Sequence, residues 1–261
     1  MQLKDKLFVV TGAGSGLGEA SARSLYAGGA YVAVLDRDKD AGQNVCKELG
    51  QRAKFFYADL GDDAGTEEAI NQSIAWSKEV GKPVSGAVNC AGIGFAGKIV
   101  GRDNKPFDLE AFKYVLQINL IGTYNVSRLV AAHMCSIEED SVSGERGCIV
   151  MVSSAAGRDG QTGQTPYSAS KGGVNGLTLP MARDLARHKI RVVTVAPTLF
   201  STKMGANTPT KAAAALQSML EFPNRFGNAD EFGHLVKSMI ENTYVNGDVY
   251  NISGASRLGK L

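Results

Sequence analysis

Residues 7–18 read Leu7-Phe8-Val9-Val10-Thr11-Gly12-Ala13-Gly14-Ser15-Gly16-Leu17-Gly18. The first four are apolar, which is typical of a short buried strand, and a glycine then occupies every second position from 12 to 18. A segment of helical period follows. Glycine here permits a sharp turn, close approach of backbone amides to a pyrophosphate, and close packing of helix on strand. The residues expected to hold that pyrophosphate, beside the helix N-terminus, are Gly12, Ser15, Gly16, Leu17 and Gly18.

The same alternation of short apolar runs with longer helical segments continues along the whole chain. The further runs are 31–35, 53–57, 86–88, 148–152, 192–195 and 248–252. Such runs indicate strands buried on both faces, and the intervening segments are long enough for crossover helices. Repeated β-α-β units predict an α/β fold with a single Rossmann-type, doubly wound parallel sheet of about seven strands and helices on both faces. No linker marks a boundary, so residues 1–261 are expected to form one domain.

Composition and charge exclude several classes of protein. The chain has 261 residues with 28 Lys and Arg against 26 Asp and Glu, a net charge of +2 that predicts neither a nucleic-acid nor a membrane partner. No apolar run approaches the ~20 residues of a bilayer span, and no signal sequence is evident. Four dispersed cysteines and three dispersed histidines argue against a metal site or a disulfide framework. We therefore expect a soluble intracellular protein, most simply a cytoplasmic one.

An acidic residue ends the second expected strand. Asp36 lies about 20 residues beyond the glycines, where a carboxylate accepts hydrogen bonds from the adenosine ribose. Its charge would repel a 2′-phosphate, which favours NAD over NADP, although Arg37 follows at once and could weaken that preference. The alternative is that Asp36 only caps a turn.

Two further strand ends carry candidate cofactor residues. Asp59 and Leu60 follow the third strand, where the adenine edge would lie, and Asn89, Ala91 and Gly92 follow the fourth. Open α/β sheets bind ligands at this edge, and small residues there leave space for a cofactor. Ordinary turn chemistry is the alternative for each of them.

The candidate catalytic residues follow the fifth strand. Ser154 ends it, and Tyr167 and Lys171 are four residues apart, hence on one face of a helix. A neighbouring ammonium stabilises a phenolate, so we expect Lys171 and an oxidised nicotinamide to lower the pKa of Tyr167 from ~10 towards neutrality. Tyr167 would then be the base, and Ser154 would hydrogen-bond the reacting oxygen. Tyr-x-x-x-Lys alone, however, usually marks an ordinary helix surface.

Asn119 is a polar amide on an otherwise apolar helical stripe. A buried amide needs hydrogen-bond partners. Asn119 therefore either satisfies neighbouring backbone groups or holds a water that passes protons from Lys171 to solvent.

Taken together, these motifs resemble the short-chain dehydrogenases/reductases. They are Thr11-Gly12-x-x-x-Gly16-x-Gly18, Asn89-x-Ala91-Gly92, Asn119, Ser154, Tyr167 and Lys171. The resemblance implies a Ser-Tyr-Lys-Asn active site, cofactor contacts from Tyr167, Lys171, Pro197 and Thr202, and usually a homotetramer or homodimer. The family commonly has Pro-Gly where this chain has Pro197-Thr198, so a backbone conformation that needs glycine could be altered near the nicotinamide.

Within that family the chain is most similar to the type-2 3-hydroxyacyl-CoA dehydrogenases, in segments such as 167–173, 178–186 and 240–242. This implies NAD-dependent oxidation of a secondary alcohol, chiefly the 3-hydroxyl of short or branched-chain acyl-CoA, and makes the mitochondrial matrix an alternative compartment. A hydroxysteroid dehydrogenase, a general carbonyl reductase, and a cofactor-binding scaffold subunit are the competing hypotheses.

Two segments are candidates for substrate contact. Residues 198–226 are expected to form an apolar lid over the active site, with an ordinary amphipathic helix as the alternative. Lys98, Arg102 and Lys105 could meet the phosphates of CoA from the opposite rim, or could belong to a solvated loop.

Overall fold

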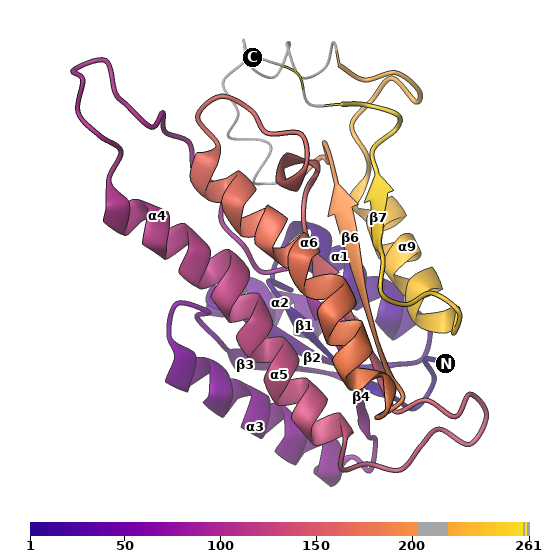
Figure 1. Cartoon of the computed structure of the whole chain (residues 1–261). Coiled ribbons are helices and arrows are strands. Elements are labelled where there is room, and N and C mark those ends of the chain that lie inside the picture. Colours follow the sequence, from indigo (N-terminus) through magenta and orange to yellow (C-terminus); the bar gives the residue numbers. More distant parts are fainter. Residues whose placement is uncertain (203–218, 258, 260–261) are drawn as a thin grey trace.

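A single sheet of seven parallel strands organises the computed structural model, which describes residues 1–202, 219–257 and 259 (Figure 1). The strand order is β3-β2-β1-β4-β5-β6-β7. The strands are β1 (Leu7–Thr11), β2 (Tyr31–Asp36), β3 (Ala53–Tyr57), β4 (Val84–Asn89), β5 (Gly147–Val152), β6 (Ile190–Pro197) and β7 (Val249–Ile252). All seven predicted strands are confirmed, and so is the doubly wound Rossmann-type fold.

Helices cover both faces of the sheet. Figure 1 shows α3, α5 and α6 in front of it and α1, α2 and α9 behind. The helical elements are α1 (Gly16–Ala27), α2 (Lys39–Leu49), α3 (Asp63–Glu79), α4 (Leu109–Leu116), the π-helix η1 (Gln117–Gly122), α5 (Thr123–Met134), the 3-10 helix η2 (Ala155–Gly157), α6 (Thr165–Ala186) and α9 (Ala229–Glu241). None of the described helices is both long and apolar enough to cross a membrane.

The strands are apolar throughout because both of their faces are buried. In β1, Leu7 and Val9 pack with α3, α5 and α6, whereas Phe8 and Val10 pack with α1 and α9. The chain reverses its direction of winding between β1 and β4, so their carboxyl ends open a crevice where a ligand can bind. The fold thus positions the predicted functional residues, which come mainly from strand ends, along one edge.

A buried arginine that sequence patterning did not indicate fastens the far end of α9 to the sheet. Arg191 in β6 is only 5% exposed, and its Nε donates to Oε1 of Glu145 at 3.0 Å. Its Nη atoms also donate to the carbonyl oxygens of Met239, Ile240 and Val245, at 2.6–2.8 Å. Every charge and donor of this pair is therefore engaged inside the protein, which is the condition under which a buried ion pair persists.

We predict that Arg191→Met lowers the free energy of unfolding by about 3–5 kcal/mol, because it removes the main partner of the buried Glu145 carboxylate, leaves it only the N-terminal amine at 3.8 Å, and frees three buried carbonyl oxygens. Urea denaturation followed by circular dichroism measures this change. The exposed Arg183→Met on α6 is the matched control and should change stability by under about 1 kcal/mol. Equal effects of the two substitutions would contradict the role assigned to Arg191.

Candidate active site

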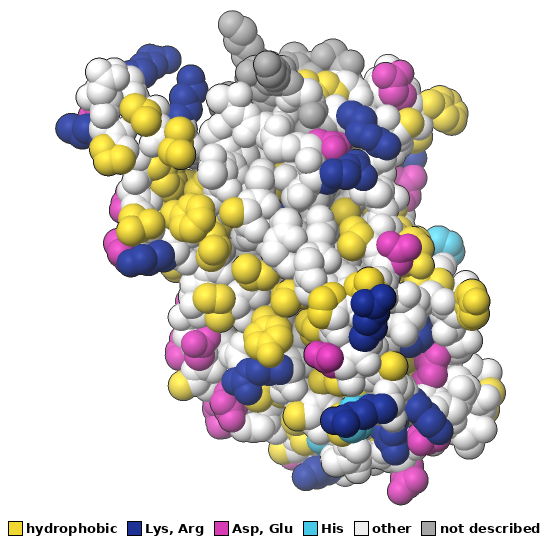
Figure 2. Space-filling view, in the orientation of Figure 1, with side chains coloured by type: hydrophobic (Ala, Val, Ile, Leu, Met, Phe, Trp, Pro, Cys, Tyr) yellow, Lys and Arg dark blue, Asp and Glu magenta, His cyan; other side chains and the backbone are white. Residues whose placement is uncertain are grey.

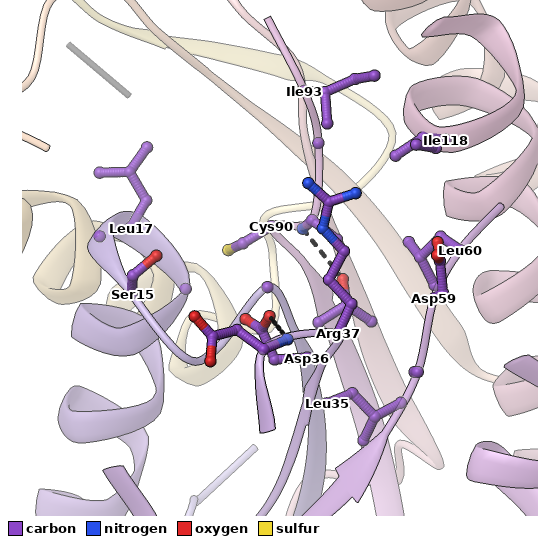
Figure 3. Close-up of a pocket in the computed structure, with 18 of the residues that line it drawn as sticks. Ser15, Leu17, Leu35, Asp36, Arg37, Asp59, Leu60, Cys90, Ile93 and Ile118 are labelled. Carbon is purple, nitrogen blue, oxygen red and sulfur yellow. Dashed lines mark hydrogen bonds between the residues drawn. The ribbon is translucent and has the colours of Figure 1, made fainter. Parts of the chain in front are cut away.

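A cavity of about 340 Å³ lies at the carboxyl ends of β1, β2 and β4 and at the start of α1 (Figure 3). The predicted cofactor residues that line it are Gly12, Ser15, Gly16, Leu17, Gly18, Asp36, Asp59, Leu60, Ala91, Gly92 and Thr202. The remaining ones, Asn89, Tyr167, Lys171 and Pro197, lie outside its lining. The residues predicted to bind a cofactor therefore fall into two groups, those that line this cavity and those outside its lining.

Two glycines make the floor of this cavity. Gly12 has a φ of +64°, and a Cβ atom there would lie 2.8 Å from the backbone of Ala91. A Cβ atom at Gly18 would overlap the carbonyl oxygen of Gly12. Thr11 Oγ1 accepts a hydrogen bond of 3.2 Å from Ala91 N, which joins the ends of β1 and β4. The close approach of these backbones leaves the first turn of α1 facing open space.

The start of α1 has the properties of an anion site. Ser15 is the N-cap residue, but its side chain makes no capping hydrogen bond. The first N–H groups of a helix have no partner within the helix, and the helix dipole adds partial positive charge. Backbone donors of α1 thus remain available to a phosphate group in the cavity.

The Asp36 carboxylate faces the cavity and also organises the turns around it. Its Oδ2 accepts from Gly14 N at 2.8 Å, and its Oδ1 accepts from Asp38 N at 2.9 Å. Asp36 therefore does cap a turn, as one of the two hypotheses for this residue expected. An ionised carboxylate offers about four lone-pair sites, so two remain for ribose hydroxyls.

Ser154, Tyr167 and Lys171 come together at the carboxyl end of β5. Lys171 is 4% exposed, and its Nζ donates to Val152 O at 2.7 Å. The same Nζ lies 5.8 Å from the centre of the Tyr167 ring. Ser154 hydrogen-bonds the Tyr167 side chain and also accepts from Ala156 N at 3.1 Å. A phenol, a hydroxyl and an amine are thus grouped in a set that can exchange a proton with an oxygen atom and hydrogen-bond it.

The pKa of Tyr167 differs from the sequence expectation. Burial raises the pKa of this phenol, and the hydrogen bond with Ser154 opposes the rise without overcoming it. Burial also lowers the pKa of Lys171, to about 8. The spacing of Tyr167 and Lys171 predicted that the two groups lie close together. In the protein without a ligand, however, desolvation disfavours both charged forms and determines the direction of each pKa shift.

Asn119 lies in η1, fully buried, and its amide makes three hydrogen bonds. Oδ1 accepts from Ile93 N at 2.8 Å, while Nδ2 donates to Ile93 O at 3.0 Å and to Ser170 Oγ at 3.1 Å. These bonds include the neighbouring backbone that the first of the two alternatives named, and the second, a water that passes protons from Lys171, stays a prediction. A Cβ atom at Gly92 would lie 3.1 Å from Asn119 Oδ1 and 3.5 Å from Lys171 Nζ. Gly92 therefore lies close to both side chains.

The other predicted positions have structural partners. Asn89 is buried and donates from Nδ2 to Ser127 Oγ at 3.0 Å, which ties β4 to α5. Thr198 does not have a positive φ, and its N–H continues the β6–β7 ladder by donating to Ile252 O at 3.2 Å. The replacement of the family's glycine therefore imposes no strained backbone there.

Sequence reasoning missed some members of the site. Ser170, a partner of Asn119, lies one turn after Tyr167, and only the three-residue spacing could have indicated it. Cys90 lines the cavity, where burial raises the pKa of its thiol to about 12, so the group is neutral at pH 7. Only the position of Cys90 between Asn89 and Ala91, at a strand end, could have indicated this residue from the sequence.

The structure describes one of the two predicted substrate segments completely and the other only in part. Most of the lid, residues 203–218, lies outside the described residues. The basic segment forms an exposed hairpin in which Val100 pairs with Pro106 and Gly97 N donates to Gly163 O at 2.7 Å, close to the start of α6. Lys98 and Arg102 are exposed there, and Lys105 pairs with Asp103 at 3.1 Å.

Lys171 should make stability depend on pH. Its pKa is about 8 in the folded protein and near its ordinary 10.5 in the unfolded chain, so between these values only the unfolded chain keeps the proton. We predict that the unfolding free energy of the wild type, relative to Lys171→Met, rises by up to about 3 kcal/mol from pH 7.5 to pH 10.5. Urea titrations at several pH values measure the difference.

The exposed Lys113→Met on α4 is the control for that series, and it should change stability by under about 1 kcal/mol. A difference between Lys171→Met and the wild type that stays constant with pH would contradict the assignment of a depressed pKa to the buried amine.

Comparison with known proteins agrees with this geometry. The family model described as short chain dehydrogenase matches residues 6–213. The 3-hydroxyacyl-CoA dehydrogenases type-2 of Bos taurus and Homo sapiens are each 42% identical over 257 residues, which is 98% of this chain and 97% of theirs. The crystal structure of 3-hydroxyacyl-CoA dehydrogenase type-2 from Mycobacterium avium has a TM-score of 0.91 at 36% identity and covers 99% of both chains. The resemblance found in the sequence is confirmed: the chain belongs to the short-chain dehydrogenase family and is an oxidoreductase.

Proposed function

We propose that this enzyme oxidises the 3-hydroxyl group of short or branched-chain 3-hydroxyacyl-CoA to the 3-ketoacyl-CoA, with NAD as the hydride acceptor. The observation that carries the proposal is the grouping of Ser154, Tyr167 and Lys171 at the end of β5, on the same sheet edge as the cavity. The substrate class rests on relatives of this chain along nearly its whole length that are named for 3-hydroxyacyl-CoA.

The cavity residues fit a nicotinamide dinucleotide. The glycine turn and the first turn of α1 would hold the pyrophosphate, and Asp36 would hold the adenosine ribose. Asp59 and Leu60 would border the adenine. The remaining candidates, which would contact the nicotinamide half, are Asn89, Ala91, Gly92, Tyr167, Lys171, Pro197 and Thr202.

The preference for NAD over NADP follows from charge at the end of β2. The Asp36 carboxylate is held facing the cavity by two backbone hydrogen bonds, so it cannot easily turn away from a 2′-phosphate. A phosphate brought close to this fixed charge would be repelled in a partly desolvated site. The ribose of NAD carries hydroxyl donors instead.

In the proposed reaction Tyr167 accepts the proton of the substrate hydroxyl and Ser154 hydrogen-bonds the same oxygen. When bound, oxidised NAD supplies the hydride acceptor and a positive charge near the phenol. Because burial alone raises the pKa of Tyr167, the phenolate needs that charge together with the Lys171 ammonium. Lowering a pKa by three units takes about 4 kcal/mol of differential stabilisation, which two cations at close range can supply.

Lys171 has a second task in this scheme. Its Nζ donates to Val152 O and would lie 3.5 Å from a Cβ atom at Gly92, so its orientation is set by the ends of β5 and β4. Asn119 would hold the backbone of Ile93 and helix α6 in fixed positions on either side of the Lys171 amine. The water-mediated proton route from Lys171 stays a prediction.

We predict that Tyr167→Phe lowers kcat for 3-hydroxybutyryl-CoA by about 10²- to 10⁴-fold, because it removes the proton acceptor. The Kd for NAD should stay within about twofold. NADH formation followed at 340 nm and calorimetric titration measure the two quantities. The control is Tyr244→Phe, which changes a tyrosine that is almost fully exposed. Substantial residual turnover in Tyr167→Phe would contradict the proton-transfer role.

The same assay separates the competing functions. Faster oxidation of estradiol than of 3-hydroxybutyryl-CoA at equal concentration would favour the hydroxysteroid dehydrogenase or carbonyl reductase hypothesis. Tight NAD binding without turnover of either compound would favour the scaffold hypothesis.

We propose that the enzyme is a homotetramer in which the face formed by α4, α5 and α6 is one of the contacts. Figure 2 shows hydrophobic side chains gathered over α4 and α5 beside a band of α6 with few charges. Between 44% and 47% of each of Tyr114, Ile121, Tyr124 and Leu179 is exposed. Gly176 has open space above it, so a second backbone could approach closely. Clustered apolar exposure of this kind is typical of an interface.

We predict that Tyr124→Glu combined with Leu179→Glu lowers the mass measured by light scattering from four chains to fewer. A buried pair of new charges at the contact would be strongly unfavourable. Val142→Glu alters an equally apolar, 78% exposed residue in the loop between α5 and β5 and should leave the mass unchanged. An unchanged mass in the double variant would rule this face out.

A further inference from the structure

Arg37 is a cation in the wall of the cofactor cavity, and its guanidinium is not paired with any acidic group among the described residues. It follows directly after β2 and lines the cavity, and Figure 3 shows its side chain extending from the strand end into the cavity, with the guanidinium towards Ile93. The residue is exposed. Within the described part of the chain, its guanidinium has neither an ion pair nor a hydrogen bond.

The acidic residues around Arg37 are hydrogen-bonded to backbone N–H groups; Asp59, which also lines the cavity, accepts from Gly61 N at 2.9 Å. Asp36 accepts from the backbone N–H groups of Gly14 and Asp38, at 2.8 Å and 2.9 Å. Asp38 caps α2 by accepting from Ala41 N at 3.0 Å. Both neighbours of Arg37 in sequence are therefore acidic, yet neither is paired with it. An arginine that extends into a cavity beside two acids, rather than pairing with them, is free to contact a ligand.

The walls around Arg37 suit a flat, uncharged ring better than a phosphate. Leu60 and Ile118 line the same end of the cavity. Leu60 is held firmly, because a Cβ atom at Gly122 of η1 would lie 2.7 Å from the Leu60 Cβ. The anion-binding turn of α1 lies on the other side of Asp36 in Figure 3. A ribose held by Asp36 would therefore place its base between the aliphatic wall and the guanidinium.

We propose that Arg37 clamps the adenine ring of the dinucleotide by laying its guanidinium over one face of the ring, opposite Leu60 and Ile118. A planar guanidinium stacks well on an aromatic face, and the interaction strengthens when water is excluded. Arg37 is then a determinant of affinity for the adenosine half, without being a partner of a phosphate. The inference rests on the proposed function only in that a nicotinamide dinucleotide binds in this cavity.

The test compares wild type, Arg37→Ala and Lys39→Ala by calorimetric titration with NADH, ADP-ribose and NADPH at 50 mM and 300 mM NaCl. Lys39 is the matched control, because it is a nearby exposed cation that lies 5.0 Å from the Tyr57 ring and does not line the cavity. We expect Arg37→Ala to weaken NADH and ADP-ribose by the same factor, about 3- to 10-fold, at both salt concentrations. Lys39→Ala should leave all Kd values within about twofold.

Four results would overturn the clamp. These are an unchanged Kd for NADH in Arg37→Ala, a loss that vanishes at 300 mM NaCl as phosphate attraction would, a loss confined to NADPH, and an equal loss in Lys39→Ala. Binding of NADH to the wild type with any of these results leaves the proposed function intact. Failure of the wild type to bind NADH would instead remove the proposed function, and the clamp with it.

Discussion

The site depends on one close approach of two backbones. The turn after β1 lies directly against the turn after β4, with room at Gly12 for a hydrogen atom but not for a methyl group. This approach lets α1 begin at the sheet edge, lets Thr11 Oγ1 bind the Ala91 backbone, and leaves the cavity open above it. Any side chain at position 12 would push the strand ends apart and misplace both the cavity and the residues after β4.

Desolvation is the second constraint, and it acts on the phenol and the amine together. Burial disfavours the phenolate of Tyr167 and the ammonium of Lys171, so each group moves towards its neutral form in the protein alone. A positive charge brought close to this pair by a bound ligand would lower the pKa of the Tyr167 phenol.

The strands were predictable from the sequence because two-sided burial requires continuous apolar runs such as Leu7–Val10. The Tyr167–Lys171 proximity was predictable because helical spacing places the two side chains on one face. Three features were not. The direction of the Tyr167 pKa shift depends on burial, Asn119 meets Ile93 across 26 residues, and Arg191 is hidden by contacts with α9 that no local pattern records. Each depends on segments distant in sequence, and local periodicity carries no information about these.

The π-helical turn η1 has a consequence for how the family can vary in length. A π-turn holds one residue more than the α-helical ladder needs, and here the surplus lies between α4 and α5, at Asn119. Losing a single residue from 117–122 would remove this surplus and leave α4 and α5 in phase with one another, but the side chains inside the turn would change direction. Asn119 would then leave Ile93, so natural insertions and deletions should avoid this turn and accumulate in the hairpin that precedes α4.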